Sequence, residues 1–195
     1  LFVLYSVFYL ELEYYFYKLF WASEIAIQDA DGYDITNHNY DLKDFQSIWL
    51  INYSLFFMSL LSLVNNVKLK NRALGIITLV LAIMVGLVFL TGGLYTLSEL
   101  RDSYLSGTLN AYYNITNYNI WIRYVPFTFF GLLVVSIYKL IRQDFLHINF
   151  KIPFELLIHT SILWIVSSEL INWMAIAESD QSYKLGMSIL WGVYA

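Results

Sequence analysis

An uncharged run over residues 73–98 is the feature that most constrains this chain. Its 26 residues, ALGIITLVLAIMVGLVFLTGGLYTLS, include no Asp, Glu, Lys or Arg. A helix needs about 20 apolar residues to cross a bilayer core of about 30 Å. Because lipid offers no hydrogen-bonding partners, only helices and closed barrels satisfy the backbone there. The run therefore predicts a membrane-spanning helix.

Comparable apolar runs recur along the chain, and the ten-residue alternation typical of transmembrane barrels is absent from the sequence. We therefore expect an all-α polytopic transmembrane helical bundle, with about five complete helices and the start of a sixth. The expected helices cover residues 1–21, 46–66, 73–98, 121–142, 153–177 and 185–195, the last of them truncated. The expected outer loops cover residues 22–45, 99–120 and 178–184. Both ends of the sequence fall inside apolar runs, so we expect residues 1–195 to be a single transmembrane domain fragment of a longer chain.

The composition excludes several other classes of protein. Hydrophobic residues make up 59% and charged residues 13% of the chain, whereas soluble domains carry about 25% charged residues. The net charge of −4 argues against nucleic acid as a partner, since phosphate neutralisation needs a basic face. The absence of cysteine excludes disulfides, thiolate metal sites and a cysteine nucleophile. The expected partners are the lipid bilayer and neighbouring helices of the same longer chain.

The charges separate the two kinds of connection. The short connections 67–72 and 139–152 hold six of the 11 Lys and Arg residues, whereas the long connections 22–44, 99–123 and 177–185 hold four of them and ten of the 15 acids. Positive charge in short loops marks the cytoplasmic side of a membrane. We therefore expect the short basic loops in the cytoplasm and the long acidic loops outside.

The C-terminal part of the sequence resembles one known family. The run ILWIVSSELINW at 162–173, followed by GMSILWGVYA at 186–195, is similar to a segment of the large bacterial inner-membrane proteins known as domain of unknown function 2339. The resemblance implies a many-helix protein of the bacterial inner membrane, and a chain longer than this one. It implies no activity, because the family has no assigned chemistry.

Three glutamates occur near the expected outer ends of helices: Glu11 (or Glu13), Glu99 and Glu169. One interpretation is an acidic ring lining an outer vestibule for cations, protons or a polar headgroup, since carboxylates in the apolar zone usually face the bundle interior. The favoured alternative is structural. Each glutamate then caps a helix turn or pairs with a nearby cation, for which Arg101, Arg123 and Lys18 are the candidates.

The helix expected at 153–177 carries a polar stripe in which Glu155 and His159 are one turn apart and Glu169 lies farther along the same face. This pattern suggests a proton relay or a substrate groove, with His159 as a titratable member. Glu155 and Glu169 are about 21 Å apart along a helix, so they cannot share one ligand atom. The favoured alternative makes His159 a hydrogen-bonding contact to a neighbouring helix.

The first outer loop contains the acidic pair Asp29 and Asp31. The spacing does not match a calcium-binding EF-hand loop. An Asp-x-Asp pair in an outer loop is also similar in pattern to multi-helix glycosyltransferases that act on lipid-linked sugars. A turn at Asp31-Gly32 is the favoured interpretation.

No part of the sequence requires a particular reaction, so we predict no catalytic, cofactor-binding or metal-binding residue and no cofactor. The preferred hypothesis is a non-enzymatic integral membrane protein with a transporter-like or envelope scaffold role. The alternative is a membrane-embedded transferase acting on a lipid-linked or envelope polysaccharide substrate. The transferase hypothesis requires Asp29, Asp31 or His38 to meet Glu99 or Glu169 at one cavity.

Overall fold

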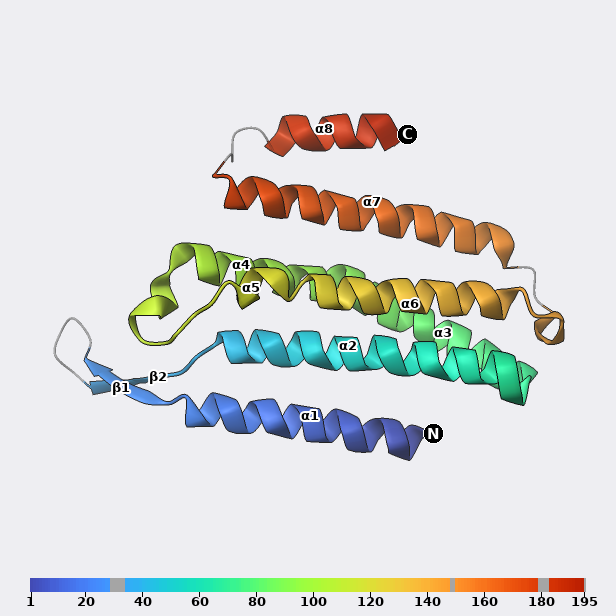
Figure 1. The fold of residues 1–195 in the computed structure, drawn as a ribbon, viewed down its shortest axis with the longest axis horizontal. Helices are drawn as coiled ribbons and strands as arrows, with labels where there is room; N and C mark the ends of the chain where they lie inside the picture. The colour runs from blue at the N-terminus through green and yellow to red at the C-terminus, as the bar shows by residue number, and fades with distance from the viewer. Residues whose placement is uncertain (29–33, 148–149, 179–182, 195) are drawn as a thin grey trace.

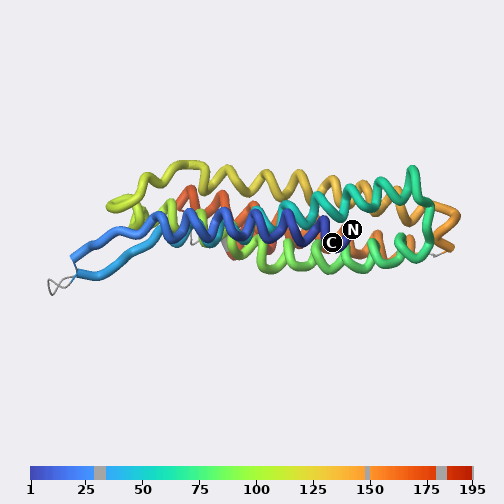
Figure 2. The backbone as a smooth tube through the Cα atoms, turned by 90° about the horizontal axis from the view of Figure 1, so that it is seen from below, coloured from blue at the N-terminus to red at the C-terminus, as the bar shows by residue number. Residues whose placement is uncertain are grey.

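Antiparallel helices form an elongated bundle in the computed structural model, with one short β-hairpin extending from an end (Figure 1, Figure 2). The structure describes residues 1–28, 34–147, 150–178 and 183–194. The helices are α1 (Phe2–Ala22), α2 (Asp41–Val64), α3 (Arg72–Val88), α4 (Leu94–Ser106), α5 (Tyr118–Trp121), α6 (Tyr124–Ile141), α7 (Lys151–Ile176) and α8 (Tyr183–Tyr194). Two π-helical turns, η1 (Asn65–Leu69) and η2 (Phe89–Gly93), and two 3₁₀ turns, η3 (Thr108–Ala111) and η4 (Asp144–Leu146), complete the helical elements of the described residues. The all-α expectation is confirmed.

The bundle has two chemically different ends. We call the end that carries the β-hairpin, the 107–117 connection and the start of α8 the hairpin end. The opposite end carries the α2–α3 turn and the 142–150 connection, and we call it the basic end because residues 67–72 and 139–152 hold six Lys and Arg residues. The chain crosses between the two ends with each successive long helix (Figure 1).

The expected loop from 99 to 120 was placed too early. The π-helical turn η2 joins α3 to α4, so one helical segment runs from Arg72 to Ser106. It ends where Gly107 adopts φ +63°, a left-handed conformation that glycine tolerates and that commonly closes helices. Glu99 consequently lies inside a helix rather than in a loop. Backbone hydrogen bonding continues past the end of the uncharged run at Ser98, so the first charged residue was a poor guide to the end of the helix.

The expected loop from 22 to 45 also contains regular structure. Strands β1 (Ile25–Gln28) and β2 (Asp34–Asn37) pair antiparallel, with Ile25 opposite Asn37 and Gln28 opposite Asp34. Helix α2 then begins at Asp41, five residues before the expected start at 46. Asp41 and Asp44 lie in its first turn, where the helix dipole stabilises negative charge.

An asparagine clip closes the turn between α2 and α3 at the basic end. The fully buried Asn65 donates from Nδ2 to the Asn71 carbonyl (3.1 Å) and accepts from the Asn71 amide (3.0 Å). Asn71 in turn caps α3 by accepting from the Leu74 amide at 3.0 Å. These bonds satisfy backbone groups that would otherwise be left unpaired at the helix end.

The core lies among α2, α3–α4 and α6. Leu55, Phe89, Leu97 and Leu140 are almost fully buried there, and Phe89 stacks obliquely on Phe130 at 5.1 Å between ring centroids. Small polar side chains join the helices. The Ser62 hydroxyl of α2, for example, donates to the Ser136 carbonyl of α6 at 3.1 Å. Such contacts are typical of helices that associate within lipid.

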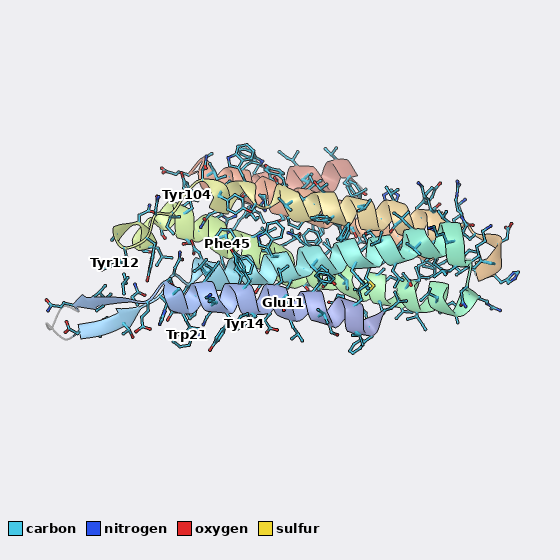
Figure 3. The ribbon with its side chains drawn as sticks, turned by 60° about the horizontal axis from the view of Figure 1, so that its bottom comes forward. Glu11, Tyr14, Trp21, Phe45, Tyr104 and Tyr112 are labelled. Atoms are coloured by element: carbon cyan, nitrogen blue, oxygen red, sulfur yellow. The ribbon has the colours of Figure 1, made fainter. Side chains whose placement is uncertain are left out.

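Four helical segments of the described residues are long and apolar enough to cross a membrane: Asp41–Leu69, Arg72–Ser106, Tyr118–Ile141 and Lys151–Ile176. The chain is therefore a membrane protein. Helix α1 is not among these segments, and it carries Glu11, Glu13 and Lys18. Glu11 and Tyr14 lie exposed along α1, and Trp21 lies on the same helix toward the hairpin end (Figure 3).

Candidate functional site

A buried arginine joins α7 to the rest of the bundle. The Arg123 side chain is 1% exposed and forms an ion pair from Nε to Glu169 Oε1. Its Nη1 donates to Asn172 Oδ1, and its Nη2 donates to Ser168 Oγ at 3.3 Å. All three partners belong to α7. We call Arg123, Ser168, Glu169 and Asn172 the arginine cluster.

The local structure explains why these groups meet. Arg123 lies at the junction between the single-turn α5 and α6. Its buried side chain extends to α7, where its ion-pair and hydrogen-bond partners lie. Ser168 and Asn172 are four residues apart and therefore share one face of α7, beside Glu169. Tyr124 also contributes, because its hydroxyl donates to Glu169 Oε2 at 3.4 Å. The planar guanidinium with five donors suits such a convergent set of oxygen acceptors.

Further buried polar contacts surround the arginine cluster at the hairpin end. Asn119 of α5 donates to the 3%-exposed Asp41 of α2 at 2.6 Å, and also to the Leu100 carbonyl of α4 at 3.4 Å. The buried Arg101 of α4 pairs with the exposed Asp102 at 2.8 Å. The first turn of α2, the end of α4, the short α5 and α7 are thus connected by polar groups at one end of the bundle.

A crevice between the η2–α4 segment and α7 lies beside this network. Its space, counted with the open space at its mouth, is about 670 Å³. The lining combines the aliphatic Leu90, Leu94 and Ile171 with hydroxyl and aromatic groups: Thr91, Tyr95 and Ser98 on one side, and Trp164, Ser167 and Ser168 on the other. Ser168 belongs both to the crevice wall and to the arginine cluster. Glu99 and Glu169 do not line the crevice; the serines that precede them in the sequence, Ser98 and Ser168, do.

The three predicted glutamates have three different surroundings. Glu169 is one-fifth exposed and paired with Arg123, which was one of the three cations named as candidate partners. Glu99 is exposed on α4, with Tyr95 one turn earlier within hydrogen-bonding reach. Glu11 is exposed on α1. Among the described residues no cavity is lined by two of these glutamates. The acidic vestibule therefore stays a prediction.

His159 and Glu155 are not joined to each other by any contact found in the described part of α7. His159 Nδ1 lies 2.8 Å from the Tyr194 hydroxyl of α8, and that hydroxyl also reaches the His159 carbonyl at 3.2 Å. This is the helix-packing contact described by the alternative interpretation of His159. Glu155 is exposed and lies 3.9 Å from Lys151.

Asp29 and Asp31 of the acidic loop lie outside the described residues. His38 is described, and its ring stacks on Phe20 of α1 at 4.7 Å between centroids. The His38 ring is 9% exposed and faces the Phe20 carbonyl. Among the described residues no group of three His, Cys, Asp or Glu side chains could hold a metal ion.

Several polar residues of this region escaped the sequence analysis. Asn119, Asn172 and Asn52 are all at most 4% exposed, and Asn52 lies midway along α2 with no hydrogen-bond partner for its amide among the described residues. For Asn52 and Asn172 the detectable signal was an amide inside an apolar run, since intramembrane polar residues usually face the protein interior. Attention to ionisable residues alone missed it.

Comparisons with known proteins give no relative: no family model, no curated protein and no solved structure matches this chain. The resemblance over 162–195 to the bacterial membrane family therefore stays a prediction.

The geometry is suited to holding helices together. A buried guanidinium whose acceptors all come from one helix ties that helix to the element that carries the arginine. Removing one member of such a pair costs about 3–5 kcal/mol, because the other charge stays buried without a partner. The arginine cluster is thus a clamp between α5–α6 and α7.

Proposed function

We propose that this chain is a non-enzymatic, multi-pass protein of a bacterial inner membrane that acts as an envelope scaffold. The observation that carries the proposal is the arginine cluster. Its carboxylate is occupied by Arg123 and its amide and hydroxyl are bonded to the same guanidinium. The polar groups of the arginine cluster therefore bond to one another and join helices, and a scaffold requires such fixed contacts between helices.

The transporter-like form of the proposal has less support. A transport path needs polar groups that line a route through the middle of the bundle. The buried serines of α2 instead bond to backbone carbonyls, as Ser59 does to Leu55 and Ser62 to Ser136. The contacts of the buried serines therefore favour the scaffold form over the transporter-like form.

The proposed orientation places the basic end in the cytoplasm and the hairpin end outside. Its support is the concentration of Lys and Arg in the two short connections. Because the chain has no native cysteine, single cysteines report the orientation cleanly. A membrane-impermeant maleimide applied to intact cells is expected to label Tyr112→Cys and to spare Lys68→Cys. The reverse labelling would contradict the proposed orientation.

The functional test compares the clamp with the acidic loop in the full-length protein. Cells lacking the native gene would receive wild type, Glu169→Gln, the charge swap Arg123→Glu with Glu169→Arg, or Asp29→Asn with Asp31→Asn. Envelope integrity, measured as detergent sensitivity, is expected to fall with Glu169→Gln and to recover partly in the swap. The Asp29/Asp31 variant is expected to behave as wild type.

One outcome would replace the proposal. If the Asp29/Asp31 variant abolishes function at a normal protein level while Glu169→Gln does not, the chemistry belongs to the outer loop. The transferase hypothesis would then take precedence over the scaffold.

A further inference from the structure

We propose that the crevice between α7 and the α3–α6 pair is a binding site for one anionic phospholipid, with the acyl chain inside the bundle and the headgroup at the basic end. The proposal rests on the membrane placement given under the proposed function. It does not depend on the arginine cluster, which lies at the other end of α7.

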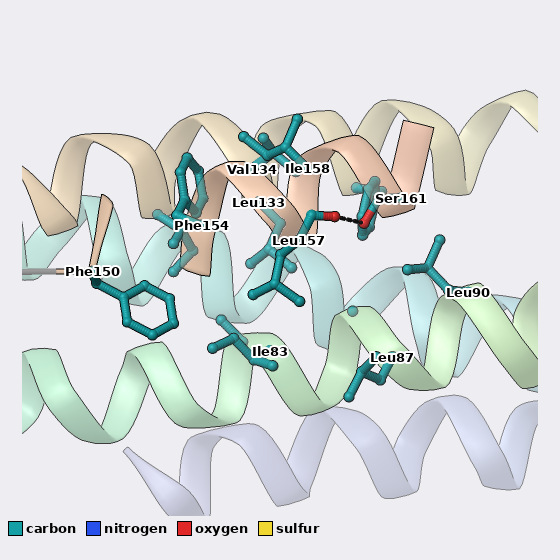
Figure 4. A pocket seen from close by; sticks show the side chains of 14 residues that line it. Ile83, Leu87, Leu90, Leu133, Val134, Phe150, Phe154, Leu157, Ile158 and Ser161 are labelled. Carbon is teal, nitrogen blue, oxygen red and sulfur yellow. Dashed lines mark hydrogen bonds between the residues drawn. The ribbon is translucent and has the colours of Figure 1, made fainter. Parts of the chain in front are cut away.

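The first observation is an apolar cleft, open on one side, with about 520 Å³ of empty space when the open space at its mouth is counted. Ile83 and Leu87 of α3 form one wall, and Leu133 of α6 and Leu157 of α7 form others (Figure 4). Its polar lining residue is Ser161, and the Ser161 hydroxyl already donates a hydrogen bond to the Leu157 carbonyl at 2.7 Å. A chamber with this lining offers contacts to hydrocarbon and no free polar partner, which suits an acyl chain.

The second observation is that this cleft shares part of its wall with a neighbouring charged hollow. Phe150, Phe154 and Ile158 line both spaces. The hollow, counted with the open space at its mouth, holds about 890 Å³, and its charged lining residues are the cations Arg142 and Lys151 and the one carboxylate Glu155. An occupant of both spaces must therefore have a long apolar part and a polar head.

The third observation concerns the sign of the charge that the headgroup must carry. Arg142 lies over the Tyr138 ring, 4.5 Å from its centroid, which holds the guanidinium at the mouth of the hollow. Lys151 is 80% exposed, and its pairing with Glu155 at 3.9 Å is long. The surrounding connections 67–72 and 139–152 hold six cations and the single acid Asp144. Basic pockets between transmembrane helices on the cytoplasmic side are suited to anionic lipid headgroups.

The fourth observation is the poor cover of α7. Only 17% of its most apolar stretch is buried, against 39% for each of the other three candidate spans. Most of the apolar surface of α7 beside the crevice is therefore uncovered by the rest of the bundle. Filling the crevice restores packing contacts that the neighbouring side chains lack.

The test measures lipid retained by the full chain in native mass spectrometry. The protein is purified from mixed phosphatidylglycerol and phosphatidylcholine nanodiscs and released from the disc in the instrument. Wild type is expected to retain one phosphatidylglycerol in preference to phosphatidylcholine. Arg142→Ala with Lys151→Ala is expected to lower that preference about tenfold, since each cation near the surface adds to anionic lipid affinity.

Two matched controls separate the site from general effects. Lys68→Ala with Arg72→Ala removes the same charges at the same end but outside the hollow, and is expected to keep the preference. Leu157→Trp fills the cavity and is expected to lose the lipid, whereas Leu156→Trp, at the exposed neighbouring position, is expected to retain it.

The proposal is overturned if both charge pairs lower the preference equally, or if Leu157→Trp retains the lipid with an unchanged circular dichroism spectrum. Because Arg142 and Lys151 are surface residues, their variant tests the site even if Leu157→Trp fails to fold. A failure of this test leaves the clamp of Arg123 unaffected, since the Arg123 variants are assayed by envelope integrity.

Discussion

Helices α2 and α7 are similar in length and composition but are held in the bundle by different means. They have 24 and 26 residues, and their most apolar stretches have mean hydropathies of 1.7 and 1.4. Yet 39% of that stretch is buried for α2 and 17% for α7. Helix α2 packs along its length through Ile48, Leu55 and small serines. Contacts of α7 with the bundle include the Arg123 cluster at one end and the stacking of Phe154 on Tyr138 near the other.

The difference shows how association works in this membrane protein. Lipid is as apolar as leucine, so hydrophobicity alone does not bring helices together. Close packing and hydrogen bonds do so along α2, and a charged clamp does so at one end of α7. The N-terminal half of α7 is left facing the crevice that we assign to a lipid.

The largest predicted effect is at the clamp. Arg123→Ala leaves Glu169 and Asn172 without their partner and is expected to cost about 3–5 kcal/mol in the free energy of unfolding. Arg123→Lys keeps the positive charge but loses the planar set of guanidinium donors, so its unfolding free energy should lie between those of Arg123→Ala and wild type. Reversible unfolding in mixed detergent measures both. A loss below about 1 kcal/mol for Arg123→Ala would show that α7 is held by other contacts.

The next effect probes close packing around α2 and η2. A Cβ atom at Gly93 would lie 2.9 Å from Phe89 Cδ2 and 3.4 Å from Ile51 Cδ1, whereas one at the adjacent Gly92 would meet nothing within 4 Å. Gly93→Ala is therefore expected to destabilise by about 1–3 kcal/mol. Gly92→Ala should be neutral or stabilise by up to about 1 kcal/mol, because alanine favours helix. Equal effects of the two substitutions in the same unfolding assay would mean that this seam is not tightly packed.

A stabilising change is expected at Asn52 in the middle of α2. Its buried amide lacks a partner among the described residues. Asn52→Leu removes an unsatisfied polar group and is expected to raise the unfolding free energy by about 1–2 kcal/mol. Thermal unfolding in detergent measures the change. Destabilisation instead would indicate that a bound molecule satisfies the amide in the native protein.

The smallest effect concerns a single bond between α2 and α6. Ser62→Ala removes the hydroxyl that donates to the Ser136 carbonyl and is expected to cost about 0.6 kcal/mol, the usual value for such bonds in membranes. Ser59→Ala is the matched control, since the equally buried Ser59 bonds within its own helix to Leu55. If the two variants lose equal stability, the bond between the helices contributes no more to stability than the bond within one helix.

The sequence predicted the helices well because uncharged runs longer than about 20 residues leave the backbone few alternatives. It predicted helix ends poorly. The segment from Glu99 to Ser106 is polar but continues the backbone ladder of α4. The hairpin strands are four residues each, too short for a periodic pattern to mark them.

The arginine cluster was only partly predictable. Arg123 was one of three named candidates for pairing with a glutamate, and nothing in the sequence could choose among them. The choice depends on α5–α6 and α7 becoming neighbours in three dimensions across 45 residues or more of chain. Asn172 has no charge to attract attention, yet it is completely buried against Arg123.

Electron paramagnetic resonance tests the central claim, that α7 is held by the Arg123 clamp while α2 and α6 pack independently of it. Spin labels go only to introduced cysteines, because the chain has none. Leu60 of α2 would be paired with Val166 of α7, or with Val135 of α6 as the control; all three are exposed. In nanodiscs, Arg123→Ala is predicted to broaden the Leu60–Val166 distance distribution and to leave Leu60–Val135 unchanged. Two unchanged distributions, or two that broaden equally, would contradict the account.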